Sequence, residues 1–443
     1  MSYPAIKLTR KIRIAIMIFL IIAFFVISPI IILYTAGYRY DFKAKKIQET
    51  GVISIDVKPK DSRVYLNGIE LKNSIPVRLT NRLPGDYNIK IKKEGYHEWK
   101  KNITVESKKT YYIKDIILFK KYFPIKISDF ENNFVFIYPS TNNGYALSIY
   151  KIENIFEVRL LDPKNNQETL VLRENMDEPP EIEWSPLGKR AIIKFVKNGV
   201  KNISLFSTGK TNVTNTYTFT DIKKNFVTQW SQENILTQDD TKILSLTDDD
   251  TSEVMKIPSS VWFIDDNDNL WQIDQETNNL LIKKDDITSS IHLPTENIAK
   301  IIDATETYII VQNQSQEISV IMYEQNRTTS TKTLPSNFLL YNNSQEEWTT
   351  WSEWEIWNIY KDGTQSLVNR LEYPIDNIIL LDDFGNIGLI SGQSVLAFNQ
   401  TYHLTYVLLD NTELENVWSD KQNKKIYFTS LDNNKTSLYK LEY

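Results

Sequence analysis

"IEWSPLGKRAIIKFVKNGVKNISLFSTG", residues 182–209, carries the pattern that decides the fold of most of this 443-residue chain. A short apolar segment runs into a Trp-Ser turn, and two further apolar segments follow, separated by another turn. Successive side chains of a strand face opposite sides of a sheet, and short apolar segments bounded by turn residues are typical of β-strands. The stretch therefore predicts a run of short antiparallel strands.

The same pattern returns throughout residues 120–443. Further copies are "VTQWSQENILTQ", "VWFIDDNDNLWQI", "KIIDATETYIIVQ", "FLLYNNSQEEWTTW", "IILLDDFGNIGLI" and "NVWSDKQNKKIYFTS", with a weaker early copy in "FIYPSTNNGYALSIYK". Their turns centre near residues 137, 184, 230, 265, 303, 342, 381 and 418. A period of about 40 residues with four strands per unit is typical of a β-propeller. We predict seven or eight blades; two stacked β-sandwiches without radial symmetry are the alternative.

One turn of this repeat has a counterpart in a known family. "WSPLGKR" at residues 184–190 resembles the Trp-Ser-Pro-Asp-Gly-Lys turn of TolB-like propellers, with Leu187 in place of the usual Asp. The other copies keep only part of this turn. The resemblance implies a propeller of the TolB or WD type.

Residues 51–119 predict a separate small domain. In "LPGDYNIKIKKEGYHEW", residues 83–99, the apolar Tyr87, Ile89 and Ile91 alternate with polar residues, which is typical of a half-buried antiparallel strand. The lysines of this stretch then form the solvated face. Upstream, Asn67-Gly68 follows another alternating segment and is a strong hairpin signal. We predict an all-β sandwich of six or seven strands.

The order of motifs in this domain resembles the PEGA domain. The matching elements are Pro59, the strand and turn Val64-Tyr65-Leu66-Asn67-Gly68, Ile75-Pro76, the turn Pro84-Gly85-Asp86-Tyr87, and the pair Gly95-Tyr96. Ile75 stands where that family usually has Thr. The resemblance implies a β-sandwich that is exported, tethered to a bacterial surface, and used for binding or spacing. It implies no catalytic residues.

The N-terminal region predicts a membrane anchor. Residues 14–37 contain no charge over 24 positions, and as a helix they would span about 36 Å, enough to cross a bilayer. We expect a cytoplasmic tail at 1–13, a transmembrane helix at 14–37 and a juxtamembrane linker at 38–50. A cleaved signal peptide is the alternative, but the apolar run is long for one and no A-x-A site follows it.

The orientation of this anchor is less clearly encoded. Four basic residues precede the helix (Lys7, Arg10, Lys11 and Arg13) and four follow it (Arg39, Lys43, Lys45 and Lys46), so the positive-inside count is a tie. We expect the N-terminus in the cytoplasm because the tail is short and long domains translocate largely regardless of charge. The bulk of the chain would then lie outside the cell membrane.

Charge is distributed unevenly between the predicted domains. Residues 1–50 carry 8 basic and 2 acidic side chains, residues 51–119 carry 14 and 8, and residues 120–443 carry 29 and 46. Nucleic-acid binding requires clustered basic side chains, so the acidic propeller disfavours that partner. The membrane and an envelope glycan or protein remain as expected partners.

The sequence shows no catalytic signature. It has no cysteine, and its three histidines (His97, His292 and His403) lie more than 100 residues apart. No phosphate-binding loop, dinucleotide fingerprint or nucleophile elbow is present, so we expect no cofactor and no enzymatic activity. A pair of carboxylates on different blades could still serve a glycan hydrolase or lyase, which is the alternative function.

One segment has the spacing of a calcium loop. Asp265, Asn267 and Asn269 stand at positions 1, 3 and 5 of such a loop, and Glu276 stands at position 12. Position 6, however, is Leu270 rather than Gly, and strands rather than helices flank the segment. We favour an ordinary polar hairpin over a metal site.

A second segment is rich in tryptophan. Trp348, Trp351, Trp354 and Trp357 follow one another at intervals of three. In a strand they would alternate between faces, so one face cannot bury all four. Blade-core packing is the favoured role, and a ligand-binding aromatic surface is the alternative.

These observations lead to one functional hypothesis. We expect a membrane-anchored, outward-facing envelope protein that binds or scaffolds a surface glycan or protein; a propeller-type hydrolase or lyase and an extracytoplasmic sensor are the alternatives. An enzyme of the glycosidase type should show a cleft with paired carboxylates. A binding protein should show an apolar or aromatic patch.

Overall fold

The computed structural model describes residues 10–35, 37–41, 46–140, 143–210, 212–213, 215–219, 228–231, 234–239, 242–247, 251–256, 261–265, 267–284, 287–336, 338–342 and 344–443. The chain divides into two compact units, Met1–Lys121 and Tyr122–Tyr443. Each unit is described by itself.

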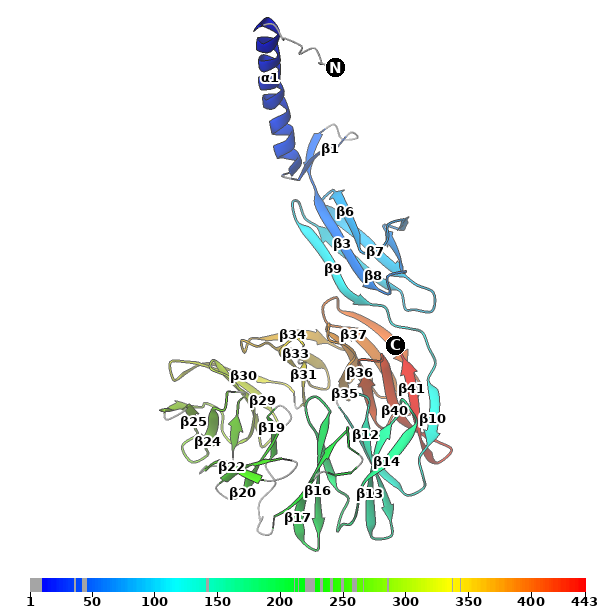
Figure 1. Ribbon diagram of the computed structural model, residues 1–443, viewed down its shortest axis with the longest axis vertical. Coiled ribbons are helices and arrows are strands. Elements are labelled where there is room, and N and C mark those ends of the chain that lie inside the picture. Colours follow the sequence, from blue (N-terminus) through cyan, green and yellow to red (C-terminus); the bar gives the residue numbers. More distant parts are fainter. Residues whose placement is uncertain are drawn as a thin grey trace, which may run out of the picture. The chain divides into compact units, whose positions relative to one another are not determined.

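The first unit begins with a single long helix, α1 (Arg10–Thr35) (Figure 1). Its mean hydropathy reaches 3.2, and none of its residues is buried by the rest of the chain. A helix of this length and composition can cross a membrane, and it can equally serve as a signal sequence. The helix starts four residues before the start of the predicted span, 14–37, and stops two residues before the end of that span.

The end of α1 is set by a glycine. Gly37 has a φ of +85°, a left-handed conformation that a residue with a Cβ adopts at a cost. Its N–H donates to the carbonyl of Tyr34 at 3.3 Å, which satisfies one of the last carbonyls of the helix. Arg39 Nη1 donates to the same carbonyl at 2.6 Å, and its guanidinium lies 3.6 Å from the centre of the Tyr34 ring.

Part of the expected linker, residues 38–41 and 46–49, forms two strands. Strands β1 (Tyr38–Asp41) and β2 (Lys46–Glu49) pair as an antiparallel hairpin. Thr50 then donates both its N–H and its hydroxyl to the carbonyl of Gly37, each at 2.9 Å. These contacts connect the end of α1 directly to the following domain.

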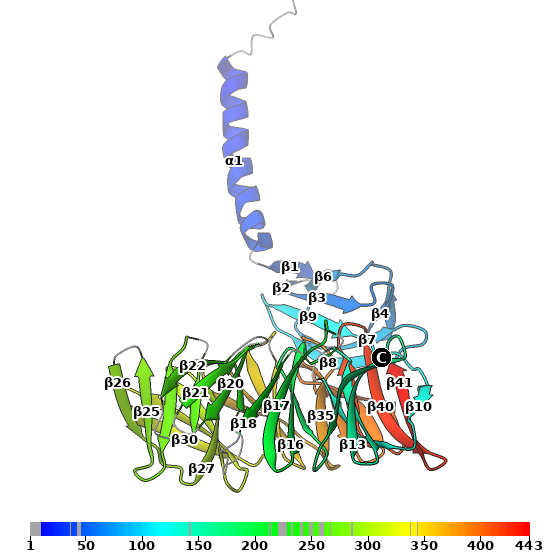
Figure 2. The ribbon, with the colours of Figure 1, turned by 60° about the horizontal axis from the view of Figure 1, so that its bottom comes forward.

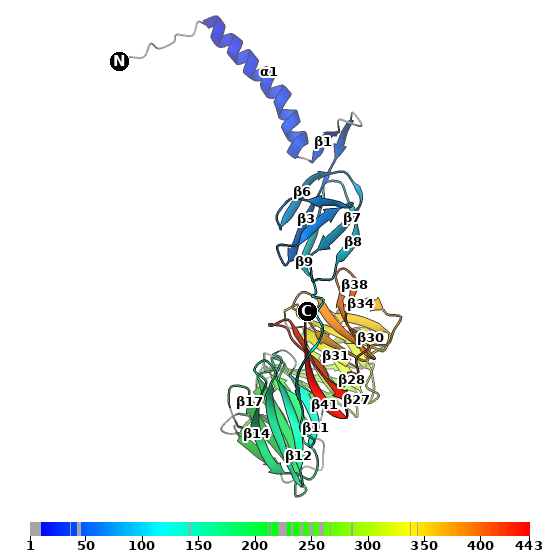
Figure 3. The same ribbon diagram turned by 90° about the vertical axis from the view of Figure 1, so that its right-hand side faces the viewer.

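That domain is a two-layered β-sandwich (Figure 3). One sheet has the order β6-β3-β9 and the other β5-β4-β7-β8, with β3 and β9 parallel. The strands are β3 (Gly51–Lys58), β4 (Arg63–Leu66), β5 (Ile69–Leu71), β6 (Val77–Arg82), β7 (Gly85–Lys92), β8 (Trp99–Val105) and β9 (Thr110–Ile117). The seven strands agree with the predicted six or seven.

The predicted alternation is present in strand β7. Ile89 and Ile91 are fully buried between the sheets. Lys90 and Lys92 lie on the other face, where both contact the carboxylate of Glu98, at 3.0 and 2.9 Å. The lysines of this stretch therefore form a solvated face of the sandwich, as expected.

The second unit contains, in the described residues, eight four-stranded antiparallel sheets that follow one another as blades (Figure 2). Blade 1 comprises β11 (Phe134–Pro139), β12 (Ala146–Ile152), β13 (Ile155–Asp162) and β14 (Gln167–Asn175), and blade 2 comprises β15 (Glu181–Trp184), β16 (Arg190–Lys197), β17 (Val200–Ser207) and β18 (Asn215–Phe219). Blade 3 comprises β19 (Thr228–Ser231), β20 (Asn234–Asp239), β21 (Lys242–Leu246) and β22 (Thr251–Lys256), and blade 4 comprises β23 (Trp262–Ile264), β24 (Leu270–Asp274), β25 (Asn279–Lys284) and β26 (Ile287–His292).

Blades 5 to 8 complete the ring. Blade 5 comprises β27 (Ile298–Ala304), β28 (Tyr308–Asn313), β29 (Ile318–Glu324) and β30 (Arg327–Leu334), and blade 6 comprises β31 (Phe338–Asn342), β32 (Glu347–Trp351), β33 (Glu355–Ile359) and β34 (Gln365–Arg370). Blade 7 comprises β35 (Asn377–Leu380), β36 (Asn386–Ser391), β37 (Ser394–Asn399) and β38 (Leu404–Leu409), and blade 8 comprises β39 (Val417–Asp420), β40 (Lys425–Asp432) and β41 (Lys435–Glu442) with β10 (Ile125–Asp129). The predicted propeller is confirmed, and the alternative of two stacked sandwiches is wrong for the described residues.

Blade 8 closes the ring by combining the two ends of the unit. Its sheet has the order β10-β41-β40-β39, so the first strand of the propeller pairs with the last. Asp129 lies opposite Ser437 and accepts a hydrogen bond from its hydroxyl at 2.6 Å. The last blade therefore cannot be completed without residues from the start of the unit.

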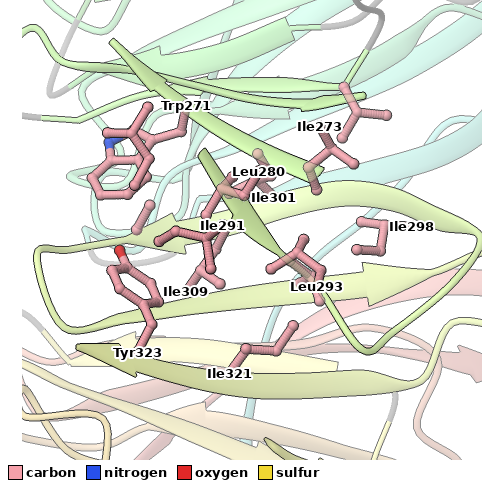
Figure 4. Packing of buried hydrophobic residues seen from close by; sticks show 14 residues of the cluster. Trp271, Ile273, Leu280, Ile291, Leu293, Ile298, Ile301, Ile309, Ile321 and Tyr323 are labelled. Carbon is pink, nitrogen blue, oxygen red and sulfur yellow. The ribbon is translucent and has the colours of Figure 1, made fainter. Parts of the chain in front are cut away.

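Apolar clusters hold neighbouring blades together. A large one joins blades 4 and 5, where Trp271 and Leu280 of one sheet pack against Ile301, Ile309 and Ile321 of the next (Figure 4). Similar clusters join blades 1 and 2, 2 and 3, 3 and 4, 5 and 6, 6 and 7, and 8 and 1. Inner strands such as β36 and β37 carry runs of consecutive buried residues, because neighbouring blades cover both faces of each sheet.

Because each blade is an antiparallel meander, the turns between its first and second strands and between its third and fourth strands lie at one edge of the propeller. We call this edge the first-turn rim. A hydrogen-bonded turn centred on an Asp occurs between the first and second strands of blades 4 and 7, and we call it the first-turn device. In blade 7 the Asp382 carboxylate accepts hydrogen bonds from the backbone N–H groups of Phe384 and Asn386 and from the Asn386 side chain. This Asx-type turn fixes the entry into the second strand.

Candidate binding pocket

A pocket of about 300 Å³ lies between blades 6 and 7 at the first-turn rim. All four turns that meet there contribute to it, since the lining comes from both first-turn segments and both third-turn segments of the two blades. Its walls are formed by Gln345, Glu347, Asn358, Tyr360, Ser366, Leu367, Val368, Gly385, Gln400, Thr401 and His403. The volume is at the lower end of the range of about 300–1,000 Å³ that is common for ligand pockets.

Glu347 is the central acidic group of the pocket. It begins strand β32, opposite Asn342, and only 9% of the residue is exposed. No described residue forms an ion pair with it. Burial raises the pKa of the Glu347 carboxyl above its ordinary value, because removal from water disfavours the charged form.

A chain of side-chain amides holds Glu347 in place. Asn358, from the neighbouring strand β33, donates one Nδ2 hydrogen to Glu347 Oε1 at 3.3 Å and one to Gln400 Oε1 of blade 7 at 2.8 Å. The hydroxyl of Thr349 donates to Asn358 Oδ1 at 3.2 Å. Asn358 is thus fully used, and its amide connects the two blades beneath the pocket.

The glutamines around the carboxylate keep free donors. Gln345 Oε1 accepts from Asn342 Nδ2 at 2.8 Å, and Gln400 Oε1 accepts from Asn358. The Nε2 group of neither glutamine donates to a described residue. Both N–H₂ groups can therefore donate to a bound molecule.

The outer wall is aromatic. Tyr360 is 39% exposed, and its hydroxyl shares a hydrogen bond of 2.8 Å with Ser366 Oγ. Leu367 pairs with Trp357 across the sheet, so its side chain lies on the face toward blade 5. On the facing blade, the His403 ring lies edge-to-face on Phe398, with 6.2 Å between ring centres. A ligand here would meet donors and one carboxylate at the base and flat apolar surface at the side.

The structure does not bring the four tryptophans of the predicted ligand-binding run together. Trp348 and Trp357 are half-buried on the face of blade 6 that packs on blade 5, whereas Trp351 is buried on the opposite face against blade 7. Trp354 is 46% exposed in the turn between β32 and β33, at the edge opposite the first-turn rim. The run therefore contributes to two different blade interfaces.

Two of these tryptophans have structural partners for their ring N–H groups, whereas the Nε1 atom of Trp351 is buried with no hydrogen-bond partner among the described residues. Trp348 Nε1 donates to Asp303 Oδ2 of blade 5 at 3.0 Å, and Trp357 Nε1 donates to Glu355 Oε2 at 2.9 Å. Trp351 stacks on Phe338 with ring centres 5.4 Å apart. An aromatic recognition surface made of all four rings is not present in this arrangement.

Glu276 lies apart from the other three predicted calcium ligands, which share one turn. The Asp265 carboxylate accepts from the N–H groups of Asn267 and Asn269, from Asn269 Nδ2 and from Trp271 Nε1, at 2.9 to 3.1 Å. Glu276 lies in the next turn, beyond the five residues of β24, which extend about 16 Å at the usual rise of a strand. No group of three or more acidic, His or Cys side chains suited to a metal occurs in the described part of the chain.

This segment is instead the blade 4 copy of the first-turn device. Asp265 and Asn269 occupy the positions of Asp382 and Asn386 in blade 7, and the sequences Asp-Asp-Asn-Asp-Asn and Asp-Asp-Phe-Gly-Asn align without gaps. The apparent calcium spacing therefore arises from a turn that recurs around the propeller.

Sequence reasoning did not identify the pocket itself. Of the residues that line it, the sequence singled out only His403, as an isolated histidine. Gln400 lies 42 residues from its partner Asn358, one full repeat away, so only the packing of adjacent blades brings them together. The repeat period was the signal available, because equivalent turns of adjacent blades must lie side by side.

Comparisons with solved structures return distant similarities. They include an uncharacterized protein, lmo1340, from Listeria monocytogenes EGD-e (9% identity, 68% of this chain and 90% of that chain covered, TM-score 0.37). Others are BamB from Moraxella catarrhalis (10%, 73% and 97%, TM-score 0.42) and virginiamycin B lyase from Staphylococcus aureus (13%, 60% and 96%, TM-score 0.37). Similarity at this level carries no information about activity. No curated protein matches the chain.

A family match exists for the first unit. The model of the PEGA domain matches residues 50–116, a range that contains strands β3 to β8 and nearly all of β9. The match agrees with the Pro-Gly-x-Tyr and Gly-Tyr motifs that the sequence shows there. Residues 50–116 are a PEGA domain, and the following unit is an eight-bladed β-propeller.

Proposed function

We propose that this chain is a membrane-anchored, outward-facing envelope protein whose propeller binds a surface glycan or protein in the pocket between blades 6 and 7. The observation that carries the proposal is the composition of that pocket. Glu347 is nine-tenths buried as a residue, and no described residue forms an ion pair with its carboxylate. This carboxylate, two glutamines whose Nε2 groups donate to no described residue, and the exposed ring of Tyr360 surround a space large enough for a small ligand.

The same composition supports binding rather than hydrolysis. Among the described residues that line the pocket, Glu347 is the single carboxylate. Glycoside hydrolysis by the usual mechanism uses two carboxyl groups on either side of the scissile bond. Because His403 also lines the pocket, an acid–base lyase or hydrolase is the second candidate, and turnover of a bound glycan would favour it.

The proposed location rests on α1 and the PEGA domain. A helix of 26 residues without acidic side chains suits an anchor, and the PEGA family implies the exported side. In intact cells, external protease should degrade residues 51–443 and leave an N-terminal tag protected. Protection of the propeller would instead place it in the cytoplasm.

A binding screen tests the proposed activity. The full-length chain, purified in detergent, should bind at least one fragment from a panel of envelope glycans and peptides. Gln400→Ala should weaken that binding at least fivefold, because it removes a donor at the pocket base. Gln393→Ala is the matched control, since Gln393 is exposed in the turn between β36 and β37, at the opposite edge of blade 7.

If a fragment binds equally well to both variants, the site lies elsewhere on the propeller. If no fragment binds, the proposed binding function fails for the ligand classes in the panel. If the protein converts a fragment to a shorter product and Glu347→Gln abolishes this conversion, the function of the pocket is catalysis rather than binding.

A further inference from the structure

We propose that the pocket between blades 6 and 7 takes a sugar unit with a free amine, whose ammonium group pairs with the Glu347 carboxylate. This inference rests on the proposed function, because it specifies the ligand class of the same pocket. Three features of the pocket support it: the charge of its base, the donors around that charge, and the shape of its outer wall.

The carboxylate at the base has no cationic partner among the described residues. No described lysine or arginine lines the pocket. The neighbouring Lys361 is 3.5 Å from Glu346, and this pair is 76% and 63% exposed, outside the lining. A carboxylate that is nine-tenths buried gains more from a hydrogen-bonded cation than an exposed one, because water screens the pair less. An ammonium group on the ligand supplies that cation.

The groups beside the carboxylate suit hydroxyls. Gln345 and Gln400 keep free N–H₂ donors, as described above, and Thr401 and His403 line the same space. Hydroxyl groups both donate and accept, so several of them on one ring can use this mixture of amide, hydroxyl and imidazole partners. The aliphatic chain of a lysine could not do so, and its four methylenes would contact these polar groups instead.

The outer wall suits the face of a sugar ring. Tyr360 is more than one-third exposed beside the pocket, and its ring offers a flat surface to the C–H face of a sugar ring. The volume of about 300 Å³ accommodates a small unit rather than a long segment. We therefore expect the pocket to bind one aminated ring, with the rest of a glycan extending into solvent.

The test compares two disaccharides that differ only in acetylation. The β-1,4-linked glucosamine disaccharide carries free amines, and its di-N-acetyl form has the same rings without the charge. With the full-length chain in detergent at pH 7, calorimetry should show at least tenfold tighter binding of the free amine. Glu347→Gln should abolish that preference while changing the affinity for the acetylated form less than twofold.

A matched variant separates this pairing from general attraction to the acidic propeller. Glu346→Gln removes the same charge one residue away, at an exposed position outside the lining, and should weaken binding of the free amine less than threefold. Equal losses in both variants would mean that the amine binds to the overall negative field, and the inference would be overturned.

The remaining outcomes distinguish failure of this inference from failure of the proposed binding function. Equal affinity for both disaccharides, sensitive to Gln400→Ala, would overturn the ammonium pairing and leave glycan binding intact. Binding of the peptide acetyl-Gly-Lys-Gly-amide through Glu347, without binding of either disaccharide, would overturn the sugar assignment and leave the cation site. Absence of binding by all three probes would overturn the inference, while the wider panel decides the proposed function.

Discussion

At the scale of single residues, Glu347 combines a stability cost with the binding role that we propose for it. Burial raises the pKa of its carboxyl, so between the ordinary Glu value of about 4.3 and the raised value the folded protein binds more protons than the unfolded chain. The free energy of unfolding therefore falls as the pH rises through this window. The ionised carboxylate is costly to bury in the empty pocket, and a bound cation would offset this cost.

Replacing this carboxylate should therefore stabilise the free protein. We expect Glu347→Gln to raise the free energy of unfolding at pH 7 by on the order of 1 kcal/mol, because the neutral amide keeps an acceptor for Asn358 and is less costly to bury. The gain should vanish at about pH 3.5, where the carboxyl is protonated in both states. Urea unfolding at the two pH values measures both effects.

Glu346→Gln serves as the control and should change stability by less than about 0.5 kcal/mol, since the residue is exposed. A Glu347→Gln protein that is less stable than the wild type at pH 7 would contradict this account. Glu347 would then be a structural acceptor that the Asn358 amide requires.

At the scale of turns and strands, the first-turn device explains features that resemble functional sites. The sequence correctly favoured a hairpin at Asp265, since Leu270 occupies the glycine position of a calcium loop. It could not reveal that the same carboxylate also accepts from Trp271, because that contact depends on how the second strand leaves the turn.

Removal of the Asp265 carboxylate tests this structural role. We expect Asp265→Ala to lower the free energy of unfolding by about 1–3 kcal/mol, because it leaves several donors of the turn without their acceptor. The loss should be the same with 1 mM calcium, about 1 mM EDTA, or neither, as measured by chemical unfolding. A calcium-dependent rise in the melting temperature that Asp265→Ala abolishes would restore the metal interpretation.

The tryptophan run illustrates what alternation can and cannot predict. Period-two geometry correctly indicated that one face could not bury all four rings. It could not assign Trp351 to the interface with blade 7 or Trp348 to the interface with blade 5, because that choice depends on the order of the blades. Whether the four tryptophan rings form one surface could therefore be decided only from the packed structure.

Two substitutions compare the extremes of this run. Trp351→Ala should cost about 3–5 kcal/mol, because it leaves a cavity between blades 6 and 7, and it should weaken ligand binding only through unfolding. Trp354→Ala, at the exposed turn, should change stability by less than about 1 kcal/mol. Thermal and urea unfolding of both variants measure the difference, and a large binding defect in folded Trp354→Ala would assign a ligand role to the opposite edge.

At the scale of the whole molecule, the repeat period carried most of the information. The eight turn centres taken from the sequence all lie in or within two residues of the first strand of a blade, from β11 to β39. The period could not show how the ring closes, since β10 precedes the first copy and pairs with β41 more than 300 residues later. It also could not predict the hairpin β1–β2, whose pairing depends on the domain that follows it.

Ring closure leads to the last prediction. Without β10, blade 8 would have three strands, and β41 would become an edge with unpaired N–H and C=O groups. Ser437 would also lose the acceptor that Asp129 provides. We expect a chain shortened to residues 122–443 to unfold cooperatively, and a chain shortened to residues 131–443 to be less stable by several kcal/mol and to associate through the open edge, because it lacks a whole strand pairing.

The comparison isolates β10, since both shortened chains lack α1 and the PEGA domain and differ only by nine residues, 122–130. Chemical unfolding measures the loss of stability, and light scattering with hydrogen exchange on β41 (Lys435–Glu442) reports the open edge. Addition of a synthetic peptide of residues 122–130 should restore protection in β41, because the strand pairs mainly through backbone hydrogen bonds. Equal stability of the two chains would mean that the packing of blade 8 against blades 1 and 7 closes the ring without the shared strand.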